Sequence, residues 1–201
     1  MISYKINEGN DTWVYWLGSS PVPIDIPETV VFVEEENYDI YFSPWPSKNV
    51  FPKSPDFEGK ADVFFNQLIT SVIPEAEQGK EVNKRILVGY SLAGLSALYF
   101  GTKTDLFSSI ASVSGSLWYP DFVEYISQHP LQCANVYFSL GDSESKSKNP
   151  MLATVEANTL LVKDLVSSYT NCIYQSNSGG HFNSIDERVL KAINWCSKAL
   201  K

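Results

Sequence analysis

The sequence predicts an α/β fold in which a mostly parallel sheet is covered by helices on both faces. Two observations predict it: segments that favour strands alternate with segments that favour helices, and several of the strand segments are apolar throughout. A strand without polar residues has to be covered on both faces, which helices between parallel strands provide. At 201 residues, the chain is expected to form one domain over residues 1–201.

The expected strands are short apolar runs that end at glycine, serine or charged residues. They comprise residues 13–17, 29–33, 86–88, 109–114, 135–140 and 171–175. Apolar residues recur at helical spacing in residues 62–73, 92–100, 122–127, 151–169 and 185–200. The proline-rich stretches at residues 18–27 and 38–53 are expected to be irregular loops.

Composition and charge limit the classes of partner. The net charge of −8 argues against a nucleic acid or an anionic membrane as the main partner. The first ten residues lack the apolar core of a signal peptide, and no stretch approaches the roughly 20 apolar residues of a membrane span. Three cysteines without a C-x-x-C pair favour reduced, buried thiols in a cytoplasmic protein over a zinc site or a disulfide framework. The sequence indicates no oligomeric state.

Residues 85–100 carry the first chemical signal. The apolar run Ile86–Val88 leads into Gly89, Ser91 and Ala93, and a buried helix follows. The small residues force a tight turn that exposes Ser91 at the carboxyl end of the strand, where the free N–H groups of the helix also point. This is the geometry of a nucleophile elbow, usually written G-x-S-x-G, with alanine in the fifth position here. Because so short a pattern also occurs by chance, the assignment depends on a base and an acid further along the chain.

A serine hydroxyl becomes a good nucleophile only when a neighbouring base takes its proton. The chain contains two histidines. His129 precedes a proline at the end of the expected helix 122–127 and is typical of a surface or helix-capping residue. His181 follows two glycines just beyond the last expected strand and comes after the serine in the chain. His181 is therefore the predicted base.

The acid is expected between the serine and the histidine in the chain. Asp142 and Glu144 lie in the loop after the expected strand 135–140, and either of them can orient an imidazole. The other is then a solvated residue of an acidic turn. Asp186 is placed instead at the start of the last expected helix, where acidic residues are common.

An oxyanion needs two backbone N–H groups to stabilise it. Leu92, directly after the serine, supplies one. The second normally comes from the loop after an earlier strand, and Ser19, in the turn after the strand 13–17, is the first candidate. The aromatic loop offers Ser43, Trp45 or Ser47 instead, because its prolines have no N–H.

Five segments in order resemble an esterase family of the α/β-hydrolase fold, from about Tyr38 to the C-terminus. The family includes enterochelin (ferric-siderophore) esterases, feruloyl esterases and S-formylglutathione hydrolases. The segments are Ser-Pro-Trp-Pro (43–46), Gly-Tyr-Ser-Leu-Ala-Gly (89–94), Val-Ser-Gly-Ser-Leu-Trp (113–118), Gly-Asp-Ser-Glu (141–144) and Gly-Gly-His (179–181). The chain departs from the family in its reduced N-terminal part, where residues 18–29 are too short for the usual first covering helix, and in having no visible lid.

The resemblance implies roles for individual residues. Ser91 is the nucleophile, His181 the base and Glu144 the acid, with Asp142 as the second choice. Trp45 and Trp118 line the acyl or alcohol pocket, for which core packing is the alternative, and Tyr90, beside the nucleophile, is assigned to the same pocket.

We therefore expect a serine esterase that cleaves small-molecule esters, of siderophore type or with small acyl groups, without a metal or an organic cofactor. A thioesterase or peptidase with the same three residues is one alternative. A hydrolase-like chain that only binds its ligand is another, which the presence of all three residues disfavours.

Overall fold

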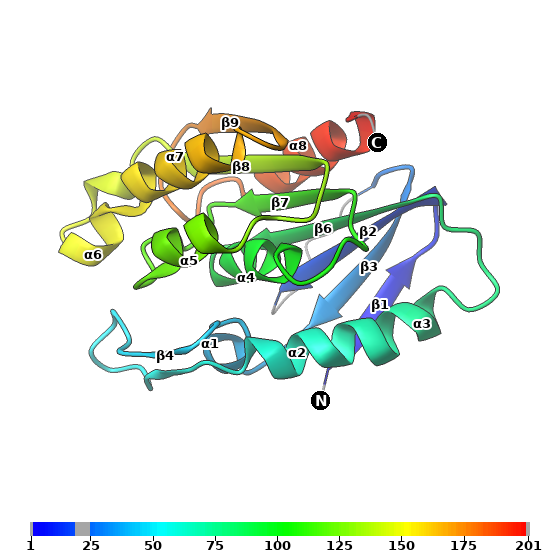
Figure 1. The fold of residues 1–201 in the computed structure, drawn as a ribbon, viewed down its shortest axis with the longest axis horizontal. Helices are drawn as coiled ribbons and strands as arrows, with labels where there is room; N and C mark the ends of the chain where they lie inside the picture. Colours follow the sequence, from blue (N-terminus) through cyan, green and yellow to red (C-terminus); the bar gives the residue numbers. More distant parts are fainter. Residues whose placement is uncertain (1, 19–24, 200–201) are drawn as a thin grey trace.

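Seven strands form one sheet in the computed structural model, which describes residues 2–18 and 25–199 (Figure 1). In spatial order they are β1 (Ser3–Asn7), β3 (Glu28–Glu34), β2 (Asn10–Gly18), β6 (Lys84–Tyr90), β7 (Ser109–Val113), β8 (Asn135–Gly141) and β9 (Asn171–Asn177). Neighbours pair in parallel, except that β1 runs antiparallel to β3. The predicted, mostly parallel sheet is confirmed.

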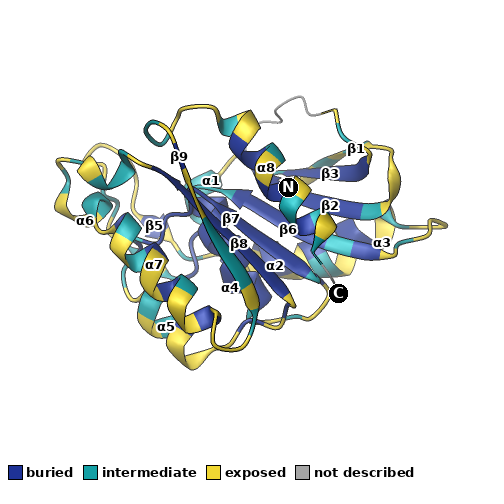
Figure 2. Ribbon diagram, turned by 90° about the horizontal axis from the view of Figure 1, so that it is seen from above, coloured by how far each residue is buried: buried dark blue, intermediate teal, exposed yellow. Residues whose placement is uncertain are grey.

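Helices cover both faces of this sheet (Figure 2). Helix α8 (Ile185–Lys198) packs on β6, β7 and β8 from one side. The other face carries α2 (Ala61–Gln67), α4 (Leu92–Gly101), α5 (Phe122–Gln128) and α7 (Val155–Val166). Successive side chains of a strand point to opposite faces: Leu87 belongs to the core under α4, whereas Ile86 and Val88 belong to the core under α8. This explains why the central strands are apolar throughout.

Two N-terminal regions are more ordered than the sequence predicts. Residues 3–7 form the edge strand β1, and Tyr4 and Ile6 from this strand pack against the core. The expected loop 38–53 contains the short helix α1 (Tyr38–Tyr41) and strand β4 (Pro46–Ser47), which pairs with β5 (Phe57–Glu58). The buried Ser43 hydroxyl donates to the Asp39 carbonyl and accepts from the Gly59 N–H. Such contacts between loop segments leave no periodic signal in the sequence.

Two helices differ from their expected limits. The helix expected over residues 62–73 continues past Pro74, because a π-helical turn (Leu68–Val72) connects α2 to α3 (Ile73–Ala76). The wider turn lies where a proline removes one helical hydrogen bond. The helix expected over residues 151–169 is divided at Thr154 into α6 (Pro150–Ala153) and α7, and Asn149 caps the N-terminus of α6 with its side chain.

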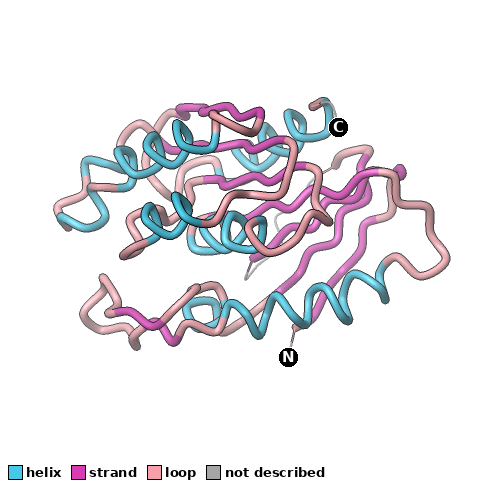
Figure 3. Tube along the Cα trace, viewed as in Figure 1, coloured by secondary structure: helices cyan, strands magenta, loops and turns pink. Residues whose placement is uncertain are grey.

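The candidate residues lie at one edge of the sheet. Ser91 follows β6, Ser114 follows β7, Glu144 lies in the loop after β8, and His181 lies in the loop after β9. Because these strands are parallel, their carboxyl ends meet at the same edge, and the loops that follow them are distinguished from the strands in Figure 3. Of the helices described here, none has both the length and the apolar character needed to cross a membrane.

Candidate active site

The elbow between β6 and α4 holds Ser91 in a strained conformation. Its φ of 57° is in the left-handed region, which non-glycine residues rarely adopt, and its N–H donates to the Val113 carbonyl at 3.0 Å. A Cβ at Gly89 would lie 2.1 Å from the Ala93 carbonyl oxygen, so only glycine fits there. Ala93, in the fifth position of the motif, is fully buried and leaves the turn tight.

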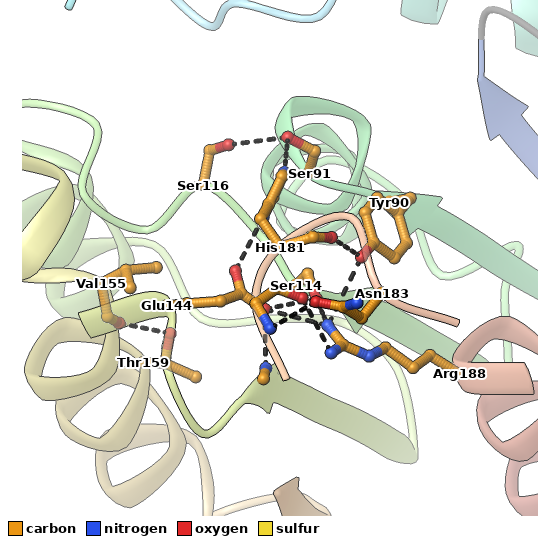
Figure 4. A network of polar contacts seen from close by, with 12 residues as sticks. Tyr90, Ser91, Ser114, Ser116, Glu144, Val155, Thr159, His181, Asn183 and Arg188 are labelled. Carbon is orange, nitrogen blue, oxygen red and sulfur yellow. Dashed lines mark hydrogen bonds and ion pairs between the residues drawn. The ribbon is translucent and has the colours of Figure 1, made fainter. Parts of the chain in front are cut away.

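The structure brings Ser91, His181 and Glu144 into one hydrogen-bonded array (Figure 4). His181 Nε2 lies 2.9 Å from Ser91 Oγ, and His181 Nδ1 lies 2.7 Å from Glu144 Oε2. An ionised carboxylate only accepts hydrogen bonds, so Nδ1 carries the proton and Nε2 presents its lone pair to the serine hydroxyl. This is the tautomer that a base for Ser91 requires.

Glu144 is 4% exposed at its side chain and is held as an anion. Burial acts to raise the pKa of its carboxyl group, but hydrogen bonds from His181, the Gly141 N–H and the Ser114 hydroxyl outweigh it and set the pKa below its usual value. Oε1 accepts from Gly141 at 2.6 Å and from Ser114 at 2.8 Å, which leaves Oε2 for the imidazole.

Asp142, the second candidate acid, has a different contact. Its Oδ1 accepts the Gly179 N–H at 3.1 Å, and its own N–H donates to the Asn177 carbonyl at 2.8 Å. The side chain therefore joins the loop after β8 to the loop that carries His181. Gly179 has a φ of 93°, which favours glycine at this point of the histidine loop.

A cavity of about 650 Å³ opens beside the array, within the size range of small-molecule sites. Its lining is mostly aromatic and aliphatic and includes Trp118 and Tyr90. Phe182, next to the histidine, lines the cavity while 84% exposed. Lys146, in a 3₁₀ turn (Glu144–Lys146), is a cation among the described lining residues.

Trp45, the other tryptophan expected at the pocket, is not among the described residues that line this cavity. Its indole N–H donates to the Pro120 carbonyl at 3.2 Å, and its ring packs on Tyr119 and Tyr125. Trp45 is partly buried and packs against the core beside the aromatic residues of α5 and of the segment before it.

Of the two predicted oxyanion donors, Leu92 lies within the described residues and Ser19 does not. Leu92 is the first residue of α4, so its N–H has no acceptor within the helix, and it adjoins Ser91. Ser19 lies outside the described residues; Gly18, just before it, lines the cavity. Among residues 2–18 and 25–199, no three His, Cys, Asp or Glu side chains are grouped as metal ligands would be.

Sequence reasoning missed four residues that support the array. The Ser116 hydroxyl lies 3.3 Å from Ser91 Oγ, and the Tyr38 hydroxyl donates to the Tyr90 carbonyl and accepts the Ala93 N–H. The Ser114 hydroxyl and the Arg188 guanidinium both reach Glu144. Ser114 and Ser116 lie in the Val-Ser-Gly-Ser-Leu-Trp segment (113–118), which resembles the esterase family and could have indicated them. No motif surrounds Tyr38 or Arg188.

Comparison with known families agrees with this geometry. A family model described as "Putative esterase" matches residues 25–184, which is more than half of the chain. The chain belongs to this esterase family. The matched residues of this esterase-family chain include Ser91, Glu144 and His181.

A curated relative covers part of the chain. The uncharacterized protein YbbA of Bacillus subtilis (strain 168) is 30% identical over 131 residues, which are 61% of this esterase-family chain and 52% of that protein. The match therefore spans about half the length of the curated relative.

Solved structures share the fold at low sequence identity. An IroE-like serine hydrolase from Shewanella oneidensis has a TM-score of 0.76 and 16% identity, and the match covers 96% of this chain and 74% of that chain. The siderophore hydrolase EstA from Aspergillus nidulans has a TM-score of 0.68 and 14% identity, with 94% of this chain and 83% of that chain covered. The likeness places this member of the esterase family in the α/β-hydrolase fold.

Proposed function

We propose that the chain is a serine hydrolase that cleaves carboxylic esters through an acyl-enzyme intermediate. The observation that carries the proposal is the continuous hydrogen-bonded path from Ser91 Oγ through the His181 imidazole to Glu144. Its distances of 2.9 and 2.7 Å are within proton-transfer reach. Membership of the esterase family supports the same chemistry.

In the first half of the proposed reaction, Ser91 attacks the ester carbonyl while His181 Nε2 takes its proton. The carbonyl oxygen becomes an oxyanion, which the Leu92 N–H stabilises together with a second backbone N–H, for which the sequence offers Ser19 as the first candidate. Glu144 holds the imidazolium through Nδ1. His181 then returns the proton to the leaving alcohol as the carbon–oxygen bond breaks, and the acyl group stays on Ser91.

In the second half, a water molecule enters and His181 takes one of its protons. The resulting hydroxide attacks the acyl carbon, the same oxyanion forms, and the carboxylic acid is released as Ser91 recovers its proton. The His181 side chain, 28% of which is accessible, borders the cavity from which the water enters. The reaction as proposed requires neither a metal nor an organic cofactor.

The proposed substrates are small-molecule esters with an apolar or aromatic part. The cavity of about 650 Å³ beside Ser91 has aromatic walls, among them Trp118 and Tyr38. The name of the Aspergillus structure identifies a siderophore hydrolase, so we include siderophore-type esters among the substrates, beside small acyl esters.

The test is the hydrolysis of p-nitrophenyl acetate by the wild type and by Ser91→Ala. We expect the variant to fall to the uncatalysed rate while it keeps the far-UV circular dichroism and melting temperature of the wild type. A fluorophosphonate probe, which reacts with activated serines, should label the wild type and leave the variant unlabelled.

Ser143→Ala is the matched control, because Ser143 lines the same cavity while its hydroxyl has no hydrogen-bond partner among the described residues. We expect it to retain hydrolysis and labelling. Full turnover or full labelling by Ser91→Ala would contradict the proposal, as would an inactive wild type over a panel of aliphatic, aromatic and siderophore-type esters.

A further inference from the structure

Helix α8 contributes a buried cation to the site. Arg188 is 1% exposed at its side chain, although it lies one turn inside a helix whose other charged residues face solvent. Isolated charges are costly to bury unless they are paired and hydrogen-bonded. The partners of this guanidinium therefore indicate what it does.

One terminal nitrogen of the guanidinium contacts the acid. Arg188 Nη1 lies 3.1 Å from Glu144 Oε1 and 3.0 Å from the Ser114 hydroxyl oxygen, which itself donates to the same carboxylate oxygen (Figure 4). These contacts complete the set of donors on Oε1. They fix the rotation of the carboxylate, so that Oε2 faces the imidazole.

The other terminal nitrogen contacts the loop that carries the base. Arg188 Nη2 donates to the Ser178 carbonyl at 3.0 Å and to the Gly180 carbonyl at 2.9 Å. These carbonyls are three residues and one residue before His181. A single planar group with fixed fork geometry thus joins the acid to the loop of the base.

Two further contacts hold the same loop. The Tyr90 hydroxyl, next to the nucleophile in the chain, donates to the His181 carbonyl and lies 3.5 Å from Arg188 Nη1. At Gly141 a Cβ would lie 2.2 Å from the Gly179 carbonyl oxygen and 2.7 Å from Arg188 Nη2. Gly141, at the end of β8, is therefore in close contact with both the histidine loop and the guanidinium.

We propose that Arg188 is a positioning residue that holds Glu144 and His181 in register for proton transfer, and that Tyr90 assists it from the β6 side. This inference rests on the proposed hydrolase function. Arg188 is not among the described residues that line the cavity, so it acts on the chemical step through its partners and leaves substrate binding unchanged.

The experiment compares Arg188→Lys and Tyr90→Phe with the wild type. A lysine keeps the charge but cannot reach the acid and the two loop carbonyls together, and phenylalanine keeps the ring while losing the hydroxyl. Because an error of about 1 Å in a catalytic group costs on the order of 100-fold in rate, we expect Arg188→Lys to lower kcat by about that factor with KM unchanged. Tyr90→Phe should lower kcat by about tenfold, the effect of about 1.4 kcal/mol.

Arg188→Ala supplies a second, independent measurement. It leaves a space the size of a guanidinium, so added guanidinium chloride, kept below denaturing concentrations, should restore part of kcat, whereas equal sodium chloride should not. A residue that only stabilised the fold would lower the melting temperature without this selective recovery of turnover.

Lys191→Met is the matched control. Lys191 lies on the same helix, but its ammonium pairs with Glu187 on the exposed side. It also lies 3.5 Å from the Asn177 side-chain oxygen, and it contacts neither Glu144 nor the carbonyls of Ser178 and Gly180. We expect its kcat and KM to match those of the wild type.

Hydrogen exchange separates the failure of this inference from the failure of the proposed function. Amides of residues 178–183 should exchange faster in Arg188→Lys than in the wild type, whether or not the chain hydrolyses any ester. An active wild type with an unchanged kcat in Arg188→Lys would overturn the inference while leaving the hydrolase proposal intact. Unchanged exchange in the loop would overturn it even if the wild type proved inactive.

Discussion

Glu144→Gln is the substitution that most directly tests the acid of the array. Glutamine has the shape of glutamate, but it replaces one carboxylate oxygen by an NH₂ group that can only donate. In the wild type both oxygens are acceptors: Oε2 faces the Nδ1–H of His181, and Oε1 faces the Gly141 N–H, the Ser114 hydroxyl and Arg188. Either orientation of the amide therefore creates a donor–donor conflict in a buried place.

The structure indicates which conflict prevails. An NH₂ group on the Oε1 side would leave the Gly141 N–H without an acceptor and would take the carboxylate oxygen away from Arg188 Nη1, and a buried unsatisfied donor costs about 1–3 kcal/mol. An NH₂ group on the Oε2 side needs only a change of tautomer at His181, which moves the proton from Nδ1 to Nε2. We expect this second orientation to dominate.

The imidazole then presents an N–H to Ser91 and cannot take its proton. A wrong tautomer of this kind, with loss of the adjacent anion, lowers kcat by about 10⁴-fold, which corresponds to about 5.5 kcal/mol of transition-state stabilisation. KM should stay near the wild-type value, because both oxygens of Glu144 are bonded to protein donors and glutamine keeps its shape, although Glu144 lines part of the cavity. Steady-state hydrolysis of p-nitrophenyl acetate measures both constants.

Asp142→Asn is the matched control for this prediction. The amide oxygen of asparagine can still accept the Gly179 N–H, so the contact between the two loops is kept. We expect kcat within about threefold of the wild type, the range of a neutral surface substitution. The reasoning is refuted if Glu144→Gln retains more than a tenth of the wild-type kcat, or if the two variants lose activity equally.

Three further outcomes follow from the same structure. Gly141→Ala should abolish most hydrolysis because its Cβ would displace the histidine loop, whereas Gly180→Ala should be tolerated because its Cβ would meet only ordinary contacts beyond 3.4 Å; paired kinetic assays check both. Trp118→Ala should raise KM for esters with an aromatic acyl group, with little change for p-nitrophenyl acetate, whose acyl group is small. Trp45→Ala, outside the cavity, should leave KM unchanged and lower the unfolding free energy by about 3 kcal/mol in urea titrations. The depressed pKa of Glu144 stabilises the folded state above the usual glutamate value of 4.5, and this contribution is lost as the pH falls through the folded pKa. Below pH 4.5, the unfolding free energy of the wild type should therefore fall more steeply than that of Glu144→Gln.

The elbow and the histidine loop show how far sequence reasoning reaches. Gly89, Ser91 and His181 are recognisable because turn geometry restricts residue type locally, and because the chain order of strands predicts which ends meet. The choice between Asp142 and Glu144 is different, because both lie in one loop and either side chain can bond an imidazole. The resemblance favours Glu144, and the structure distinguishes the two by their contacts: Glu144 Oε2 faces the imidazole of His181, whereas Asp142 accepts the Gly179 N–H.

The sequence around Arg188 indicates that this residue is buried, but not which residues it contacts. With Ile185, Val189 and Ala192 it lies on the apolar stripe of α8, where a charged residue is unexpected. Helical spacing can therefore suggest that Arg188 is buried. It cannot name the partner, because Glu144 and the loop carbonyls approach from β8 and β9, which lie elsewhere in the chain.

The sequence by itself determined the α/β class, the alternation of the central strands and their helices, and the elbow, because apolar periodicity and the steric demands of glycine act over a few neighbouring residues. The tertiary structure decided which carboxylate faces His181, that Trp45 packs against the core while Trp118 lines the cavity, and that residues 3–7 join the sheet. These outcomes depend on contacts between segments far apart in the chain. The energies of these contacts depend on distance and burial in three dimensions, and local patterns in the sequence carry no information about either.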